Sequence, residues 1–293
     1  TERVIIFDNF SSGNEKHYKS CLPDNRLEVI RGEVSDTEML ANVLEGCDTV
    51  VHLASNPDIA AAATNPSVDF HEGTSLTHSV VEAARRAHVH TVLYASGSGV
   101  YGDTGLIECV ENITPTIPVS TYGASKLAGE ALMAAYSFMY GMRCFAFRFA
   151  NVVGPHQTHG VGLDFLKKLR LDSKKLEIMG DGSQSKSYVH VSDVVKAVLM
   201  AESKSTNSFD VFNVATTDSI TVREIALLAI EELGLDSLTV QLSYGDGDRG
   251  WKGDVPIIRL SSKKIRSMGW SNNLSTPDAM RKSLHELNSE FEK

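Results

Sequence analysis

Short hydrophobic runs alternate with segments of helical periodicity along the first half of the chain. Runs typical of β-strands, rich in Val, Ile, Leu and Tyr, cover residues 4–9, 27–32, 49–55 and 91–96. Helical patterns occupy residues 36–45 and 67–87 between them. Strands that alternate with helices predict βαβ units and a parallel sheet, so we expect an α/β fold.

A longer helical pattern begins near Tyr122 and ends at Gly141. It is rich in Ala, Leu, Met and Glu, and Leu127 and Phe138 belong to its apolar stripe. Tyr122 and Lys126 are four residues apart, so a helix places them on one face. A free tyrosine hydroxyl has a pKa of about 10, and a nearby ammonium favours the phenolate. The pair is therefore a candidate base for proton abstraction near neutral pH.

Composition and charge argue against several other classes of protein. The 293 residues carry a net charge of −9 without a Lys/Arg cluster, which is not typical of a nucleic-acid-binding surface. No apolar run approaches the roughly 18 residues of a membrane span, and the first residues do not resemble a signal peptide. Neither the histidines nor the four cysteines show the spacing of metal ligands or of a disulfide framework. We therefore expect a cytoplasmic protein without a metal ion.

The predicted strand at 91–96 leads into a turn of small residues, Ser96-Gly97-Ser98-Gly99, followed by Val-Tyr-Gly. Small residues at the carboxyl end of a parallel strand let a ligand approach the backbone. This segment, followed by Tyr122-Gly-Ala-Ser-Lys126, resembles the extended short-chain dehydrogenase/reductase family, and within it the sugar-nucleotide 4-epimerases. The resemblance covers essentially the whole chain.

The resemblance implies a Rossmann-type doubly wound parallel sheet together with a smaller α+β domain that binds the substrate. We expect the NAD-binding domain to comprise residues 1–153 and about 186–215. The nucleotide-sugar-binding domain would then comprise residues 154–185 and 216–293.

A Rossmann-type domain normally opens with a strand, a Gly-rich loop and a helix whose amino end takes the pyrophosphate. The printed sequence begins instead at what resembles the second strand, which ends in Asp8. We therefore expect the first βα unit to be missing, and the natural polypeptide to extend roughly 25 to 30 residues further, the size of such a unit. The alternative is a chain that starts here and does not hold NAD in the usual way.

Asp8 stands where the family bonds the adenosine ribose, which favours NAD over NADP. A simple strand-end turn, helped by Ser11-Ser12-Gly13, is the competing interpretation of the same residues. His52 is interpreted as a packed strand histidine. The residues that the resemblance assigns to the cofactor are Asp8, Asn9, Ser11, Ser12, Gly13, Glu33, Val34, Leu53, Ala54, Ser55, Ser96, Tyr122 and Lys126.

In the family, the tyrosine takes the proton of the sugar 4-hydroxyl during transient oxidation at C4. The resemblance therefore makes Tyr122 the base and Lys126 the group that lowers its pKa and bonds the nicotinamide ribose. Gly97 replaces the Ser or Thr that usually bonds the reacting oxygen, and we expect Ser98 to take over this role. Related 4,6-dehydratases carry Asp-Glu directly after that position, where this chain has Ser98 and Gly99, so dehydration is not expected.

The second half of the chain supplies the residues that the resemblance assigns to the substrate. Lys186 replaces the usual Arg at the diphosphate, and a lysine lacks the bidentate fork. Three assignments have simpler alternatives: a strand-end turn for Asn151, core packing for Met179 and surface solvation for Arg249. The full set is Ser98, Tyr122, Asn151, Val161, Met179, Lys186, Arg249 and Asp254.

The resemblance thus implies an NAD-dependent 4-epimerase of UDP-glucose and UDP-galactose. UDP-glucuronate and UDP-N-acetylhexosamines are alternative substrates. A non-catalytic dinucleotide or nucleotide-sugar binding protein is the alternative of another class, motivated by Gly97, by Gly73 in place of the Asn that the epimerases usually carry, and by the absent Gly-rich loop. Members of the family commonly dimerise through the helices that correspond to residues 67–87 and 121–140, so we expect a homodimer, with no nucleic-acid or membrane partner.

Overall fold

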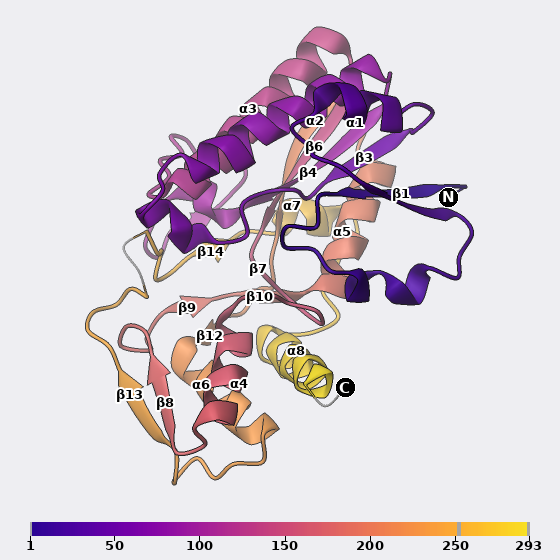
Figure 1. Cartoon of the computed structure of the whole chain (residues 1–293). Coiled ribbons are helices and arrows are strands. Elements are labelled where there is room, and N and C mark those ends of the chain that lie inside the picture. The colour runs from indigo at the N-terminus through magenta and orange to yellow at the C-terminus, as the bar shows by residue number, and fades with distance from the viewer. Residues whose placement is uncertain (1, 251–252, 292–293) are drawn as a thin grey trace. The chain divides into compact units, whose positions relative to one another are not determined.

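A computed structural model describes residues 2–250 and 253–291 and has an α/β fold with parallel strand pairs, as the sequence pattern predicts (Figure 1). The chain forms two compact units. The first comprises Thr1–Ser96, Ala124–Ala146 and Thr206–Asp210, and the second Gly97–Gly123, Phe147–Ser205 and Val211–Lys293. This division follows compactness, whereas the division expected from the sequence follows the ligand that each part would hold. The latter stays a prediction.

The first unit contains the strands and helices predicted for the first half of the chain. Its elements are β1 (Val4–Asp8), β2 (Leu27–Arg31), α1 (Thr37–Val43), β3 (Thr49–His52), α2 (Leu76–Arg86), β4 (Thr91–Gly97) and most of α3 (Thr121–Tyr140). The short helices η1 (Glu15–His17), η2 (Lys19–Cys21), η3 (Ile59–Ala63) and η4 (Phe70–Ser75) lie in the connections. The strands β6 (Arg143–Phe149) and β11 (Phe209–Val214) begin in this unit and continue beyond its boundary.

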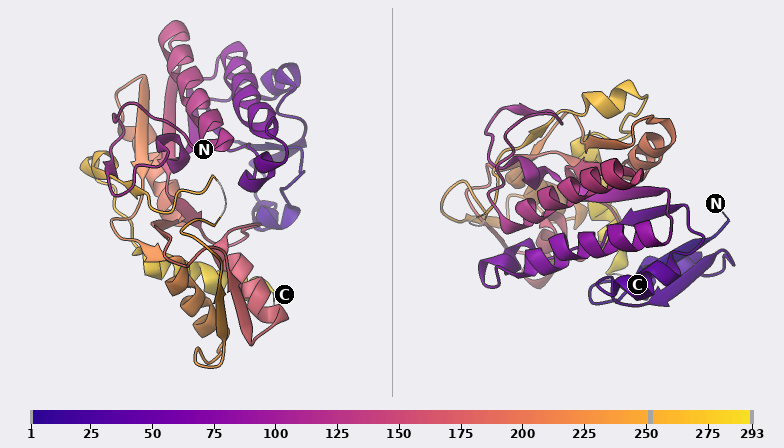
Figure 2. Two further views of the ribbon diagram at one scale, coloured as in Figure 1. Left: turned by 90° about the vertical axis from the view of Figure 1, so that its left-hand side faces the viewer. Right: turned by 90° about the horizontal axis from the view of Figure 1, so that it is seen from above.

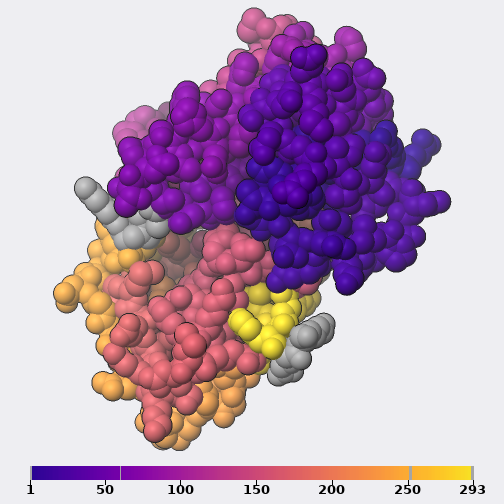
Figure 3. Space-filling view, viewed as in Figure 1, coloured from indigo at the N-terminus to yellow at the C-terminus, as the bar shows by residue number. Residues whose placement is uncertain are grey.

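The strands of the first unit belong to two separate sheets, and each sheet contains a parallel pair. β3 pairs in parallel with β4, Thr49 opposite Thr91, in a four-stranded sheet of order β11-β6-β4-β3. β1 pairs in parallel with β2 in a separate sheet, Asp8 opposite Arg31. No residue of β1 or β2 is fully buried, and these N-terminal residues lie at the surface of the unit (Figure 3).

The helix predicted at 67–87 is interrupted in its first turns by η4, a π-helical segment. Gly73 lies in this segment, and a Cβ there would come within 2.5 Å of the Ser125 hydroxyl on α3. The close approach of η4 to α3 therefore requires a glycine. Further along, α2 and α3 run side by side (Figure 2), and the Tyr136 hydroxyl donates to Glu82.

The described residues of the second unit form short strands, five complete α-helices and the short helix η5. Its elements are η5 (Ser98–Tyr101), β5 (Glu108–Cys109), β7 (Asn151–Val153), α4 (Val161–Leu171), β8 (Lys175–Ile178), β9 (Ser185–Lys186), β10 (Tyr188–His190), α5 (Val191–Lys204), β12 (Ile220–Thr221), α6 (Val222–Glu232), β13 (Gln241–Tyr244), β14 (Arg259–Leu260), α7 (Lys263–Ser267) and α8 (Thr276–Glu290). β7 pairs in parallel with β10, and β8 with β13.

The core of the second unit lies where α4, α6 and α8 pack together on one side of β8 and β13 (Figure 2). Phe165, Leu176 and Ile225 are fully buried there. Thr221 and Glu224 form a capping box that fixes the start of α6, and Ser275 caps α8. Such caps satisfy backbone donors that a helix start leaves open.

None of the described helices combines the length and the apolar composition that crossing a bilayer requires. Among residues 2–250 and 253–291, no group of three or more His, Cys, Asp or Glu side chains is arranged to hold a metal ion.

Candidate functional site

Tyr122, the predicted base, and Lys126 both lie on α3, which begins at Thr121 and is continuous to Tyr140. Tyr122 is half-buried and Lys126 is buried, one helical turn further along. The Lys126 Nζ donates to the backbone oxygen of Ala95, 2.9 Å away at the carboxyl end of β4. It also lies 5.2 Å from the centre of the Tyr94 ring, a cation–π contact. Lys126 is thus held where the carboxyl end of β4 meets α3.

Two further contacts attach α3 to β4. Gly129 allows the helix to approach so closely that a Cβ there would lie 2.4 Å from the Tyr94 hydroxyl. The Ser96 hydroxyl donates to the buried carboxylate of Glu130 at 2.5 Å. The Ser96 hydroxyl is thus turned toward α3 and serves the packing of the helix on the strand, while a role of Ser96 in binding the cofactor stays a prediction.

Burial determines the electrostatics of this region. Desolvation lowers the pKa of Lys126 to about 8, and the negative charge of Asp69 opposes this shift. Burial, with the charge of Lys126, lowers the pKa of His52 to about 3, so this histidine is neutral. His52 stacks on Tyr94, and its Nε2 lies 3.0 Å from the Thr77 hydroxyl. These contacts confirm the interpretation of His52 as a packed strand histidine.

The turn after β4 lies against the start of α3 within the second unit. Gly99 and Gly123 touch through their backbones, since a Cβ on Gly123 would come 2.4 Å from the Gly99 oxygen. This contact brings η5, and with it Ser98, beside the residue that follows Tyr122. Gly97 has an extended backbone, and a Cβ built there meets no described atom within 4 Å. The space for the missing hydroxyl is therefore open.

The structure brings together several residues assigned to the adenosine end of NAD. Asp8 and Asn9 end β1, and Glu33 follows the neighbouring parallel strand β2. The Asn9 amide donates to Glu33 at 3.1 Å and accepts from the Ser11 backbone. A Cβ on Gly13 would stand 3.4 Å from the Asp8 carboxylate, so the turn closes around this acid. Ser12 and Val34 lie in the same two loops, Ser12 exposed and Val34 half-buried.

The segment after β3 supplies the remaining predicted cofactor residues. Leu53 is 67% exposed, and Ala54 is half-buried. The Ser55 hydroxyl is buried and has no hydrogen-bond partner among the described residues. A buried polar atom without a partner is costly, so an additional group that supplies the hydrogen bond fits this position. The residues present therefore suit a polar ligand such as a dinucleotide.

The two basic side chains predicted to bind the substrate, Lys186 and Arg249, both contact Asp254 in the second unit. The Lys186 Nζ donates to Asp254 at 2.6 Å. The Arg249 guanidinium donates to the Asp254 backbone oxygen and to the Asp103 carboxylate, which lowers the pKa of Asp103. Gly250 lies next to Met179, because a Cβ built on this glycine would be 3.9 Å from the Cβ of Met179. Four of the predicted residues therefore share one region.

The other predicted substrate residues have more ordinary surroundings. Asn151 begins β7, and its amide lies 3.4 Å from the Ser187 backbone oxygen, beside Lys186. Val161 begins α4 and packs against the core of the second unit. Met179 follows β8 and is 64% exposed, so core packing does not account for it.

Sequence reasoning missed Glu130, Asp103, Asp69 and Asn56. Glu130 had a usable signal, because it lies four residues after Lys126 and so continues the same helix face. Asp103 and Asn56 act through contacts that are distant in sequence and carry no such signal.

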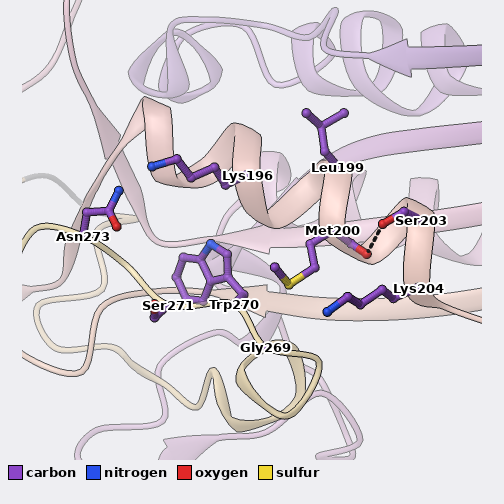
Figure 4. Close-up of a pocket in the computed structure, with 9 residues that line it drawn as sticks. All are labelled: Lys196, Leu199, Met200, Ser203, Lys204, Gly269, Trp270, Ser271 and Asn273. Atoms are coloured by element: carbon purple, nitrogen blue, oxygen red, sulfur yellow. Dashed lines mark hydrogen bonds between the residues drawn. The ribbon is translucent and has the colours of Figure 1, made fainter.

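A separate hollow of about 590 Å³ lies in the second unit between α5 and the segment after α7. Its lining residues include Trp270 and, on α5, Lys196 and Met200, and Figure 4 shows the Trp270 ring next to Met200. None of the predicted site residues lines this hollow.

Comparison with known proteins identifies the family of this chain. The family model described as the NAD dependent epimerase/dehydratase family matches residues 1–215. A UDP-glucose 4-epimerase of Mycolicibacterium smegmatis is 30% identical over 287 residues, covering 96% of this chain and 89% of that protein. A solved UDP-galactose 4-epimerase is 35% identical with a TM-score of 0.86, covering 98% of this chain and 91% of its own.

A dehydratase is similar as well. The dTDP-glucose 4,6-dehydratase of Streptomyces venezuelae, solved with NAD bound, is 26% identical with a TM-score of 0.87, covering 98% of this chain and 88% of its own. Likeness of fold therefore does not separate epimerisation from dehydration. The family to which the chain belongs is nevertheless clear from the match over residues 1–215, and the Tyr122 and Lys126 pair lies on α3. The chain belongs to the NAD-dependent epimerase/dehydratase family of sugar-nucleotide enzymes, whose cofactor is NAD.

Proposed function

We propose that this protein catalyses the 4-epimerisation of a nucleoside-diphosphate sugar, with UDP-glucose and UDP-galactose as the substrate pair. The observation that carries the proposal is the position of Lys126. Its ammonium is fixed at the carboxyl end of β4 by the Ala95 oxygen, one turn along α3 from Tyr122. The relatives named as UDP-glucose and UDP-galactose 4-epimerases support the choice of substrate.

We assign the cofactor to the residues at the ends of β1, β2 and β3. Asp8 would bond the adenosine ribose, and Ser55 would donate the hydrogen bond for which no described residue supplies a partner. The other members of the set are Asn9, Ser11, Ser12, Gly13, Glu33, Val34, Leu53, Ala54, Tyr122 and Lys126. When bound, NAD supplies the reversible oxidation at the sugar C4.

The chain's own residues move the proton. Tyr122 accepts the proton of the sugar 4-hydroxyl and returns it after the ketone has turned over. The nearby Lys126 ammonium favours the tyrosinate form through its charge. Ser98 is half-buried at the start of η5 and would bond the reacting oxygen in place of the residue missing at Gly97.

Lys186 and Arg249 would receive the diphosphate in the second unit. Both cations now contact carboxylates, those of Asp254 and Asp103. A diphosphate would share or replace these contacts, and Asp254 would then be available to the nucleoside ribose. Met179 is exposed beside this region and would supply an apolar face to the base, while Asn151 and Val161 complete the proposed set.

The panel of substrates tests this proposal. The protein, supplied with NAD, is incubated separately with UDP-galactose, UDP-glucuronate, UDP-N-acetylglucosamine and dTDP-glucose, and the products are identified by NMR. We expect the C4 epimer of UDP-galactose. We expect no 4-keto-6-deoxy product from dTDP-glucose, because Ser98 and Gly99 offer no acid for the elimination of water. Bound NAD without turnover of any sugar would instead indicate a non-catalytic binding protein.

The role of Tyr122 has a matched control on the same helix. Tyr122→Phe should lower kcat by about 10² to 10⁴-fold, the usual contribution of a positioned general base. Tyr140→Phe removes a hydroxyl from an exposed residue at the far end of α3 and should leave kcat unchanged. Equal activity of the two variants would contradict the assignment of Tyr122 as the base.

We also propose that the protein forms a homodimer through α3. Phe138 is 92% exposed near the end of this helix, and Met139 and Tyr140 beside it are exposed as well. A cluster of large apolar side chains in water is typical of a protein interface.

A further inference from the structure

The two basic side chains assigned to the diphosphate are paired with acids. The Lys186 ammonium contacts the Asp254 carboxylate, and the Arg249 guanidinium contacts the Asp103 carboxylate at 2.5 Å. All four residues belong to the second unit. A diphosphate is itself an anion, so it would compete with these carboxylates for the same donors. The two contacts differ in how a ligand could enter them.

The contact between Lys186 and Asp254 can be shared with a ligand. The ammonium donates to Asp254 Oδ1 at 2.6 Å, and an ammonium has further N–H groups that can point to a phosphate. The Asp254 side chain is 12% exposed, and its Oδ2 accepts from the Gly250 backbone. This carboxylate is therefore held in place without preventing Lys186 from binding a second anion.

The contact between Arg249 and Asp103 cannot be shared in this way. The Arg249 Nη1 donates to the Asp254 backbone oxygen, and Nη2 donates to Asp103 Oδ2. Because a guanidinium is planar, it gives a phosphate two parallel hydrogen bonds either from Nε and Nη2 or from Nη1 and Nη2. Both arrangements use Nη2, the group that Asp103 occupies. A bidentate contact between Arg249 and a phosphate therefore requires the displacement of Asp103.

The surroundings of this pair allow such a displacement. The Arg249 side chain is 37% exposed and that of Asp103 35%, and ion pairs in contact with water contribute little to stability. Asp103 lies in a tight turn, because Gly102 before it has a φ of +73° and a Cβ there would stand 1.9 Å from the Ile117 oxygen. The Gly105 backbone donates to Asp103 Oδ1. The turn therefore holds the carboxylate back when the guanidinium moves to a ligand.

A purely structural role of the pair predicts the opposite effect on binding. If the pair only held the loop of Arg249 against the turn of Asp103, its removal would loosen the site and weaken the binding of a nucleotide. If Asp103 competes with the ligand, its removal strengthens binding, because the guanidinium no longer has to leave a carboxylate. The sign of the change in affinity separates the two roles.

We propose that Asp103 determines the affinity of the diphosphate site, because its carboxylate occupies the Nη2 group of Arg249 and competes for it with the diphosphate of a nucleotide. The inference rests on the proposed function, which assigns Arg249 to the diphosphate. It concerns binding alone and requires no turnover of the sugar.

The test is isothermal titration calorimetry of the full chain with UDP as the probe. Asp103→Asn keeps the size of the side chain and removes its charge. We expect this variant to bind UDP about fivefold more tightly than the unsubstituted protein, the value of a strong exposed ion pair. Equal or weaker binding would overturn the proposal.

Asp248→Asn is the matched control for the loss of one negative charge. The Asp248 side chain is 68% exposed, and its carboxylate lies 3.9 Å from the Arg249 Nε, beyond hydrogen-bond distance. The affinity for UDP should change by less than about twofold in this variant. A gain as large as that of Asp103→Asn would mean that any lost charge suffices, which overturns the specific role of Asp103.

A double-mutant cycle tests whether Asp103 acts through Arg249. Arg249→Gln should weaken the binding of UDP, since a charged donor to the phosphates is lost. In this background Asp103→Asn should bring no gain, because no guanidinium remains to be released. A gain of equal size in both backgrounds would contradict the competition for Nη2.

The outcomes also separate this inference from the proposed function. If Asp103→Asn tightens UDP binding and no sugar nucleotide is epimerised, the proposed function fails while the role of Asp103 stands. If epimerisation occurs and the affinity for UDP is unchanged in Asp103→Asn, the function stands while the inference fails. Absence of UDP binding by both the unsubstituted protein and Asp103→Asn would overturn the inference as well.

Discussion

At the scale of single residues, the proposed site contains the Tyr122 and Lys126 pair of the family motif and lacks the hydroxyl residue that the motif usually has at the position of Gly97. Tyr122 and Lys126 have the helical spacing that their motif requires. Gly97 leaves an open position where the motif resemblance expects a hydroxyl, and neighbouring Ser96 cannot fill it because its hydroxyl is bonded to Glu130. In the proposed mechanism, the reactivity of the pair depends on how well Ser98 replaces the missing donor.

Because Gly97 lacks a hydroxyl, we predict that a substitution at this position raises kcat. Gly97→Ser should raise kcat by about tenfold, the value of one added hydrogen bond of roughly 1.4 kcal/mol to the reacting oxygen. The backbone there is extended and a Cβ meets no described atom within 4 Å, so the fold should accept the change. Steady-state kinetics with UDP-galactose provide the measurement.

Gly97→Ala separates the hydroxyl from the effect of filling space. This variant should keep the original kcat and stabilise the protein slightly, by about 0.4 to 1 kcal/mol, because alanine restricts the unfolded chain. An equal rise in kcat for Ala and Ser would show that the hydroxyl is not responsible.

At the scale of elements, the attachment of α3 to β4 holds Lys126 in place, and with it the helix that carries Tyr122. Gly129 sets the distance between helix and strand, and Glu130 with Ser96 fixes the position of the helix along the strand. The π-helical segment η4 is held against the same helix through Gly73. Lys126 is therefore fixed by three elements that lie far apart in the sequence.

Gly129→Ala tests this attachment. Helix propensity alone favours alanine over glycine by about 1 kcal/mol. We expect the opposite result, a net loss of roughly 1 to 3 kcal/mol, because the new Cβ would stand 2.4 Å from the Tyr94 hydroxyl and overpack the contact. Urea unfolding measures the difference.

The exposed position Ala131 on the same helix provides the comparison. Ala131→Gly should destabilise the protein by about the propensity value alone, roughly 1 kcal/mol. A stabilised Gly129→Ala variant would show that the helix does not lie as close to β4 as described.

At the scale of the whole molecule, the two units carry different halves of the proposed chemistry. The residues assigned to NAD lie almost entirely in the first unit, and those assigned to the nucleotide sugar lie in the second. α3 contributes to both, because Tyr122 belongs to the second unit and Lys126 to the first. Because α3 is continuous, its helical geometry fixes the spacing between Tyr122 and Lys126.

The assembly proposed from the end of α3 is tested by Phe138→Glu. A charge at this exposed apolar position should disfavour an interface, so we expect the dissociation constant of the dimer to rise at least tenfold, equivalent to about 1.4 kcal/mol. Sedimentation equilibrium measures the change. Leu238→Glu serves as control, since Leu238 is equally exposed at 92% but lies in the second unit. A monomer in the unsubstituted protein would reject the dimer itself.

The sequence by itself determined the elements of the first unit and the placement of Tyr122 and Lys126. Alternation of apolar runs and helical spacing are local properties, so β1 to β4 and α3 could be predicted within a few residues. The turn around Asp8 and the cations Lys186 and Arg249 were likewise found through motifs that are contiguous in the chain.

Only the tertiary structure decided what each of these residues contacts. The bond between Ser96 and Glu130 and the pairing of Arg249 with Asp103 join residues 34 and 146 positions apart. Such contacts depend on the packing of a strand, a helix and a loop against one another, and electrostatic effects depend on the burial that this packing produces. The sequence therefore pointed to the groups that we propose to react, and the fold decided how deeply they are buried and what they contact.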